Sequence, residues 1–215
     1  VAPSRGLGDV YKRQMVTRVG KKIAAATEQY LRNNGLESEI KNFAWEFNLV
    51  NDPQVNAFCM PGGKIVVYEG LMQLVSSDDE LAVVVGHEVA HAVAKHSNER
   101  MSQQLMAQYG AQILGQALSN KSAAVQKIGA SVYGLGAQYG VMLPFSRKHE
   151  SEADYMGLVF MAMAGYNPAV AVNFWQKMSA GKSGSTPEFM STHPSDATRI
   201  NEIKPVSYTH LRAHE

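Results

Sequence analysis

His87-Glu88-Val89-Ala90-His91 is the most informative segment of this sequence. Two histidines four residues apart share one face of an α-helix, so their imidazoles can converge on one metal ion. Glu88 lies about 100° round the helix from His87, close enough to meet a water in the open position of the metal. The pattern predicts a metal site with an acid/base residue beside it. A chance match on a buried helix is the alternative.

The residues around this HExxH motif predict the helix that it needs. Ser77-Asp78-Asp79-Glu80 has the pattern of a capping box, with Ser77 as N-cap and Glu80 at the third helical position. The acidic residues also suit the positive end of the helix dipole. An apolar stripe then runs through the motif, formed by Leu81, Val84, Val85, Val89 and Val93.

A catalytic zinc site has three protein ligands and one open position, so a third ligand must lie elsewhere in the chain. The extended HExxHxxGxxH pattern is excluded, because Ala94 and Ser97 occupy its glycine and histidine positions. His96 points off the face shared by the two histidines. Glu99 lies about 12 Å further along the helix axis than His91, which is too far.

The acidic segment His149-Glu150-Ser151-Glu152-Ala153-Asp154 remains as the source of the third ligand. Glu150 and Asp154 are four residues apart and share a helix face, whereas Glu152 lies about 200° from Glu150 and should face solvent. We therefore predict that Glu150 binds the metal and that Asp154 orients the N–H of a histidine ligand. A surface acidic cluster is the alternative for this segment.

The rest of the chain is predicted to be α+β and predominantly helical, with a small sheet. Strands are expected near residues 43–49, 55–60 and 64–68, the last two joined in a hairpin by Pro61-Gly62-Gly63. Helices are expected at 16–34, 70–75, from 77 through the motif, twice within 98–143 with a break near Ser119-Asn120, from Ser146 to about Ala164, at 167–179 and at 195–204.

Residues 128–146 carry no charge, which raises the question of a membrane span. Several glycines, together with glutamine, serine and Pro144, make this segment only weakly hydrophobic. We expect a packing helix or a flap over the site instead.

Both ends of the chain resemble translated adapter sequence from a sequencing library, one adapter strand at each end. Residues 1–14 and 205–215 are therefore interpreted as tails, and residues 15–204 as one domain. The tails account for the net positive charge of the chain. Without them, 20 basic and 19 acidic residues become 16 and 17, by loss of Arg5, Lys12, Arg13 and Arg212 and of Asp9 and Glu215.

This charge balance argues against one class of partner. A domain without net positive charge and without an aromatic platform is not expected to bind nucleic acid. The single cysteine, Cys59, excludes an internal disulfide framework.

The separated motifs resemble those of a known family. HEVAH at 87–91, followed by Ser146-Arg147-Lys148-His149-Glu150-Ser151-Glu152-Ala153-Asp154, is similar to the gluzincin metallopeptidases of peptidase family M48. That family includes the CAAX prenyl protease, the heat-shock membrane protease and bacterial outer-membrane quality-control proteases. The similarity extends to Asn56-Ala57-Phe58 with Pro61-Gly62-Gly63, and to His193-Pro194 through Arg199-Ile200. The sequence looks like the short, soluble, single-domain bacterial members.

The resemblance implies a zincin-like metalloprotease fold over residues 15–204, with a small sheet whose edge strand lines the cleft. It implies one Zn²⁺ per chain, held by His87, His91 and Glu150. Glu88 would act as general base on a zinc-activated water, and would then pass the proton to the leaving amine.

The resemblance also assigns supporting residues. It places His193 near the metal, either as a donor to the oxyanion of the scissile carbonyl or as a plug in the open position of the zinc. Arg199 would support the site from the following helix. Asn56, Ala57 and Phe58 would form the edge strand on which substrate adds as an extra strand, with an ordinary hairpin strand as the alternative.

The function implied is a zinc metalloendopeptidase that hydrolyses peptide bonds of unfolded or misassembled envelope proteins, with the outer-membrane assembly machinery as a possible partner. Its location would be the bacterial periplasm, as a soluble protein or a membrane-anchored lipoprotein whose export signal is missing from this fragment. A chaperone-like module that keeps the fold and the zinc but cleaves little is the alternative. The intact Glu88 favours the enzyme, because binding alone needs no general base.

Overall fold

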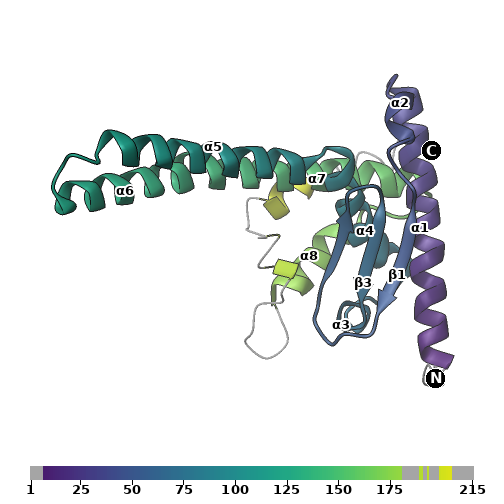
Figure 1. Cartoon of the computed structure of the whole chain (residues 1–215). Coiled ribbons are helices and arrows are strands. Elements are labelled where there is room, and N and C mark those ends of the chain that lie inside the picture. Colours follow the sequence, from purple (N-terminus) through teal and green to yellow (C-terminus); the bar gives the residue numbers. More distant parts are fainter. Residues whose placement is uncertain (1–6, 181–188, 191–192, 194–198, 205–215) are drawn as a thin grey trace, which may run out of the picture. The chain divides into compact units, whose positions relative to one another are not determined.

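The computed structural model describes residues 7–180, 189–190, 193 and 199–204. The chain divides into two compact units (Figure 1). The first, here called the sheet unit, comprises Val1–Ala94 and Glu150–Glu215. The second, the hairpin unit, comprises Lys95–His149. The predicted class, α+β and predominantly helical with a small sheet, is confirmed.

The sheet unit contains three strands and most of the helices. The elements before the HExxH motif are α1 (Leu7–Asn33), α2 (Glu37–Ile40), β1 (Glu46–Val50), β2 (Ala57–Met60), β3 (Lys64–Tyr68) and α3 (Glu69–Met72). The motif itself lies on α4 (Asp78–Val93). The later elements are the part of α7 (Leu143–Met163) from Glu150 onward, α8 (Val170–Ala180) and helical residues at 189–190 and 199–204.

The described strands form a mixed sheet in the order β1-β3-β2. β1 runs parallel to β3, and β2 pairs antiparallel to β3 through the predicted hairpin. Gly62 and Gly63 have φ values of +87° and +86°, in the left-handed region that glycine adopts without strain, which explains why the turn falls there. Because β2 pairs with β3 alone, it is an edge strand of the described sheet.

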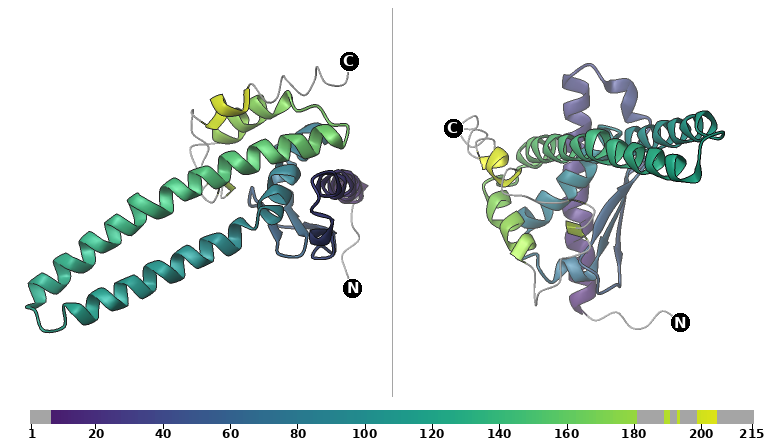
Figure 2. Two further views of the ribbon diagram at one scale, coloured as in Figure 1. Left: turned by 90° about the horizontal axis from the view of Figure 1, so that it is seen from above. Right: turned by 90° about the vertical axis from the view of Figure 1, so that its left-hand side faces the viewer.

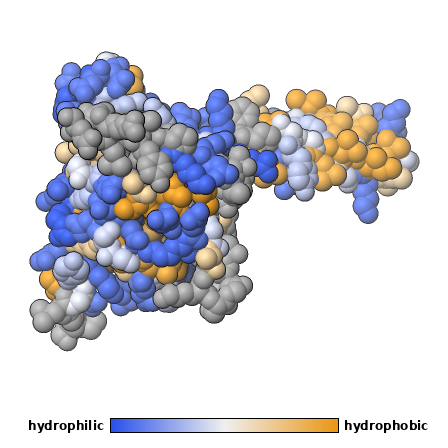
Figure 3. Space-filling view, turned by 180° about the vertical axis from the view of Figure 1, so that it is seen from behind, coloured by the Kyte–Doolittle hydropathy of each residue, from blue (hydrophilic) through white to orange (hydrophobic). Residues whose placement is uncertain are grey.

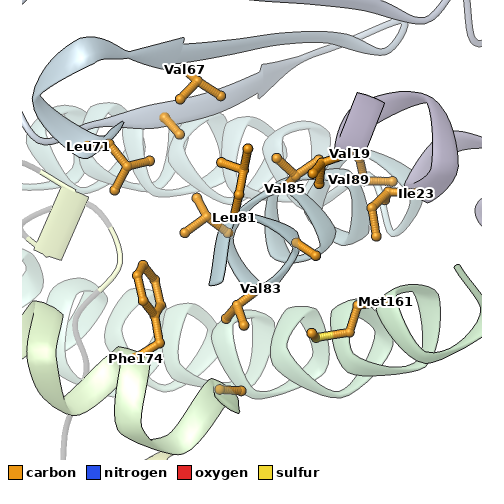
Figure 4. Close-up of a cluster of buried hydrophobic side chains, with 14 of the residues drawn as sticks. Val19, Ile23, Val67, Leu71, Leu81, Val83, Val85, Val89, Met161 and Phe174 are labelled. Carbon is orange, nitrogen blue, oxygen red and sulfur yellow. The ribbon is translucent and has the colours of Figure 1, made fainter. Parts of the chain in front are cut away.

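α4 is the central element of the core. Ten consecutive residues, from Leu81 to Ala90, are buried, so the helix is covered on all sides. In Figure 4, Leu81 and Val85 point towards the sheet, whereas Val83 points towards Phe174 and Met161 on the opposite side. The HExxH motif is thus fixed inside a packed core.

The predicted start of α4 is confirmed. Ser77 Oγ accepts a hydrogen bond of 3.2 Å from the amide of Glu80. The carboxylate of Glu80 turns back to the amide of Ser76, at 2.7 Å, and also pairs with Lys177, at 2.7 Å. In a standard capping box, Glu80 would bond to the amide of Ser77. Here its carboxylate accepts from the amide of the preceding residue, Ser76, and also pairs with Lys177 of α8.

Two expected helix starts differ from the structure. α1 begins at Leu7 rather than at residue 16, so it runs into the segment interpreted as a tail. Ser146 was expected to open a helix, but α6 (Ala123–Ala137) continues through the π-helical η1 (Gln138–Met142) into α7. The wider π turn accommodates the glycine-rich segment without ending the helix, so Ser146 lies inside α7 and its Oγ accepts from Arg100 instead.

The end of α7 and the later helices agree more closely with the sequence analysis. Gly165, the predicted cap, has a φ of +81° two residues after α7 ends. Residues 199–204 are helical, within the final helix expected over 195–204. Residues 195–198 of that prediction, and the tail at 205–215, lie outside the described residues.

The hairpin unit consists of α5 (His96–Ala117), α6, η1 and the first residues of α7. α5 and α6 run side by side in opposite directions (Figure 2), and the chain turns between Ala117 and Ala123. This turn confirms the break predicted near Ser119-Asn120. Within the described part of the chain, no helix is both long enough and apolar enough to span a membrane.

α4 and α7 touch through their backbones beside the HExxH motif. A Cβ atom on Gly86 would lie 2.8 Å from the carbonyl oxygen of Gly157, and one on Gly157 would lie 2.8 Å from the amide nitrogen of His87. Only glycine at both positions permits this approach. The contact brings the acidic face of α7 to the histidine face of α4.

This contact leads to a testable prediction. Replacing Gly157 by alanine should destabilise the protein by about 1–3 kcal/mol, because the added methyl group forces two backbones apart. It should also weaken metal binding. Gly134→Ala is the matched control: it lies in a helix, a Cβ atom there would meet nothing within 4 Å, and the change should stabilise by about 0.5–1 kcal/mol. Denaturant midpoints and metal titration test both, and equal effects of the two changes would contradict the role of the contact.

Candidate metal centre

Four side chains converge at the crossing of α4 and α7. His87 and His91 come from α4, Glu150 from α7, and His193 from beyond α8. One ligand atom of each lies within 4.8 Å of all the others. In the described part of the chain, no other group of three or more histidine, cysteine or acidic side chains comes together in this way.

The predicted ligands lie at distances that suit a shared ion. His87 Nε2 is 3.0 Å from His91 Nε2 and 3.3 Å from Glu150 Oε2, and His91 Nε2 is 3.4 Å from Glu150 Oε1. Imidazole nitrogens and a carboxylate oxygen are the donors that zinc prefers in catalytic sites. The residues present therefore fit a zinc ion.

His193 is directed at the same point. Its Nδ1 lies 3.2 Å from both carboxylate oxygens of Glu150 and 3.3 Å from His87 Nε2. Its Nε2 is 3.5 Å from Glu88 Oε1. The side chain thus stands between the candidate ligands and the candidate base.

The orientation of His87 is set by its other nitrogen. His87 Nδ1–H donates to Asp154 Oδ1 at 2.9 Å, which leaves Nε2 facing the cluster. Asp154 is buried and accepts from Nε and Nη2 of Arg199, the second contact at 2.9 Å. A carboxylate one turn after Glu150 therefore holds the imidazole in place.

Arg199 connects several parts of the site. Besides Asp154, its Nη1 lies 3.1 Å from Glu150 Oε2 and donates to the carbonyl oxygen of His193 at 3.2 Å. Burial opposes the charge of Asp154, but the hydrogen bonds and charge of Arg199 keep the pKa of that carboxyl below its usual value. The guanidinium thus keeps Asp154 ionised and fixes the backbone at His193.

The electrostatics of the cluster favour a positive charge at its centre. Burial opposes ionisation of Glu150, yet hydrogen bonds from His193, His87 and His91 hold its pKa well below the ordinary range. Burial lowers the pKa of His91 to about 3, so its imidazole is neutral at pH 7 and can offer a nitrogen lone pair to a metal ion. Burial also disfavours charge on His87, but hydrogen bonds to Asp154 and Glu150 raise its pKa to about 9.

Glu88 lies beside the cluster with one oxygen available. Its side chain is 4% exposed, and within the described residues Glu88 Oε1 is buried without a hydrogen-bond partner. Burial raises the pKa of this carboxyl, although His193 and His87 pull it down. A carboxylate made more basic by burial, with an unpartnered oxygen, is suited to accept a proton.

The segment predicted to bind substrate lies at the edge of the sheet. Ala57 and Phe58 belong to β2, and Asn56 precedes it. The carbonyl of Asn56 accepts from Tyr68 on β3, so alternation turns the backbone groups of Ala57 and Cys59 to the free edge. Asn56 Oδ1 already accepts from the amide of Ala57 at 2.9 Å.

Two aromatic residues that sequence reasoning did not assign to the site pack around the histidines. Phe189 stacks on His193 with ring centres 4.6 Å apart, and Trp175 lies 5.4 Å from the ring of His87. Trp175 and Phe189 are themselves stacked at 5.7 Å, and Arg199 lies over Trp175. Trp175 follows the apolar pattern of a packing helix, and no motif surrounds Phe189. The sequence therefore contained no indication that either residue lies beside the metal ligands.

The nearby residues that were excluded as ligands lie outside the cluster. Glu152 is exposed on α7. In the hairpin unit, His96 stacks on His149 with ring centres 4.2 Å apart, and His149 Nε2 is 2.9 Å from Glu99 Oε2. These three form a separate group.

Comparison with known proteins agrees with this geometry. Residues 17–207 match the model described as Peptidase family M48. The chain belongs to peptidase family M48. The match confirms the resemblance of the motifs and the predicted class, a metallopeptidase of the HExxH type.

The relatives of this M48 chain include proteins named OMA1 metalloendopeptidase and proteins named beta-barrel assembly-enhancing protease. It is 35% identical to the mitochondrial metalloendopeptidase OMA1 of Schizosaccharomyces pombe, over 88% of this chain and 51% of that protein. It is 41% identical to the OMA1 of Arabidopsis thaliana, over 75% and 31%. It is 31% identical to the beta-barrel assembly-enhancing protease of Yersinia pestis, over 93% and 44%. The chain therefore spans about half or less of these relatives.

Proposed function

We propose that this M48 chain is a zinc-dependent endopeptidase, with His87, His91 and Glu150 as ligands and Glu88 as general base. One observation carries the proposal. Nitrogen and oxygen donors of the HExxH helix and of α7 converge in a buried site, and an unpartnered carboxylate oxygen of Glu88 lies beside them. A protein that only binds its partner needs the metal ligands at most. Hydrolysis needs the metal ligands and also a carboxylate that accepts the proton of the attacking water.

When bound, zinc would lower the pKa of a water molecule to about 7 and polarise the scissile carbonyl. The chain supplies the remaining steps. Glu88 would accept the proton of the attacking water at Oε1, which makes no hydrogen bond in the described structure, and return it to the leaving amine. Asp154 holds the Nδ1 proton of His87, and Arg199 keeps Asp154 ionised, so the ligand nitrogen stays in position.

We propose that substrates are extended segments of unfolded or misassembled polypeptides. The outer edge of β2 in the described sheet supports this, because an extended peptide can pair with the backbone groups of Ala57 and Cys59 that face away from β3. The backbone amide of Cys59 also lowers the pKa of Glu88, which indicates that this edge faces the base. The side chain of Asn56 must release the amide of Ala57 when a substrate strand binds.

The proposed setting is the bacterial envelope, with the protein periplasmic or lipid-anchored and its substrates drawn from envelope proteins. The name of the Yersinia pestis relative supports a link to β-barrel assembly, whereas the OMA1 names refer to mitochondria. The complete reading frame of the gene tests the envelope setting, because a bacterial envelope protein requires an export signal. A reading frame without such a signal would contradict this setting.

The direct test of the proposed activity is cleavage of casein by the whole chain. We expect cleavage that a chelator abolishes and that added zinc restores. A chaperone-like module predicts something else: suppression of casein aggregation, with no cleavage in any of the three conditions. Intact casein in the zinc-loaded sample, after His193 has also been replaced, would exclude the endopeptidase.

His193 has two proposed roles that predict opposite effects. As an oxyanion donor it would accelerate cleavage, and as a plug it would occupy the position that water needs. The 3.2 Å contacts of His193 Nδ1 with Glu150 support the plug, because a ring at that distance adds a fourth donor to the other three. The stacking of Phe189 on His193 supports a stable resting position.

Replacing His193 by alanine should therefore raise the basal rate of casein cleavage, or cause self-cleavage, while zinc content is retained. Initial rates and intact-mass measurements of wild type and variant test this. In the donor role the same change would instead lower turnover by roughly a hundredfold. An unchanged rate would rule out both roles.

A further inference from the structure

The hairpin unit exposes many large apolar side chains. None of the residues of α6 is buried, and in α5 only His96 is. Ile113 and Ile128 are 68% and 65% exposed. Figure 3 shows a cluster of hydrophobic residues on the side of this hairpin that is in view. Soluble surfaces usually carry such residues singly, so a cluster of them indicates a binding surface.

The exposed apolar residues form one face on each helix. On α5 they fall within an arc of about 140°, and on α6 within about 80°. We call these the outer faces; they consist of Met101, Leu105, Met106, Tyr109 and Ile113 on α5, and Val125, Ile128, Val132 and Leu135 on α6.

The opposite faces of the two helices face each other. They line a cavity of about 640 Å³ within the unit, and its wall contains Leu114 and Leu118 as well as Ala107 and Ala130. The helices are joined there by Tyr133, whose hydroxyl donates to the carbonyl of Ala107 and fits against Gly110. The apolar side chains of the outer faces are therefore turned away from the neighbouring helix.

The charge of the hairpin unit indicates what covers the outer faces. Glu99 is its only acidic residue, and it pairs with His149. Six basic residues give the unit a net charge of +5 with neutral histidines: Lys95, Arg100, Lys121, Lys127, Arg147 and Lys148. A second copy of the same unit would be repelled by this charge, whereas an anionic surface would be attracted.

We propose that the outer faces of α5 and α6 bind the surface of a bilayer that contains anionic phospholipids. Helices with an apolar face and flanking lysines lie in the interface, with their apolar residues among the acyl chains and their lysines at the headgroups. Lys127 lies on α6 about 80° round the helix from the apolar face, and Lys121 precedes the first turn of α6. This inference does not depend on the metal centre.

Cosedimentation of the whole chain with vesicles tests the proposal. We expect binding to vesicles of phosphatidylcholine mixed with phosphatidylglycerol, and much weaker binding to phosphatidylcholine alone. The double variant Ile128→Ser, Val132→Ser should reduce binding at least about tenfold, because two aliphatic side chains no longer enter the bilayer. Lys121→Glu with Lys127→Glu should reduce it by roughly fivefold or more for each lysine.

Matched controls come from the sheet unit. Leu36→Ser with Val50→Ser removes two exposed apolar side chains, and Lys21→Glu with Lys41→Glu reverses two exposed lysines. Both should bind vesicles like wild type, and circular dichroism should show all variants folded. Equal binding of the hairpin and control variants would overturn the proposal, as would equal binding to both kinds of vesicle. An oligomer in sedimentation velocity that only the Ile128, Val132 variant dissociates would assign the faces to a second copy instead.

Discussion

Glu88→Gln should lower the rate of casein cleavage by about 10²–10⁴-fold while leaving zinc content and thermal stability unchanged. Glutamine keeps the volume of the side chain, so the packing of α4 is retained. Its amide cannot take up the proton of the attacking water. In the described structure Glu88 Oε1 is buried beside the ligand cluster without a hydrogen-bond partner, so the change removes an acceptor from this position.

The control for this prediction is Glu152→Gln, which makes the same chemical change at an exposed position of α7. Its cleavage rate should equal that of wild type. Initial rates at saturating zinc, together with the zinc content of each protein, provide the measurement. Wild-type activity in Glu88→Gln would refute the general-base role, and loss of zinc in that variant would mean that Glu88 is a ligand instead.

Glu150→Ala should weaken zinc binding by more than about a hundredfold, beyond the effect of losing only a hydrogen-bond partner of a ligand. The carboxylate contributes an oxygen to the cluster and also lies within 3.4 Å of His87, His91 and His193. Removing it leaves two histidines of α4 without the donor that α7 brings to them. The zinc retained per chain during dialysis against a chelator of known affinity gives the change.

Glu152→Ala distinguishes a ligand effect from a general effect of charge. Glu152 lies two residues further along α7 and is exposed, so its loss changes the net charge equally but removes no donor from the site. We expect wild-type zinc affinity in this variant. If Glu152→Ala lost zinc and Glu150→Ala kept it, the assignment of the third ligand would be reversed.

Most elements with strong local signals were predicted correctly from the sequence. The cap at Ser77 and the apolar stripe after it located the start of α4, and Pro61-Gly62-Gly63 located the hairpin turn. Such features depend on contacts between residues a few positions apart. The start of α7 was wrong because a serine before an acidic segment resembles an N-cap, whereas the chain continues as a π turn through residues 138–142.

In the candidate site, too, the sequence predicted the local geometry but not the contacts between distant segments. The i, i+4 spacing of His87 and His91, and of Glu150 and Asp154, places each pair on one helix face by helix geometry alone. The spacing says nothing about whether two helices so distant in the chain cross at these residues. The contact of Gly86 with Gly157 decides this, because it allows the backbones of α4 and α7 to touch.

The sequence by itself determined which side chains share a helix face, because the backbone period is set by short-range hydrogen bonds and sterics. Only the tertiary structure decided which faces meet. It brought Phe189 and Trp175 against the histidines and connected Arg199 to Asp154, Glu150 and the backbone of His193. These contacts arise from packing between segments far apart in the chain, and local patterns carry no record of that packing.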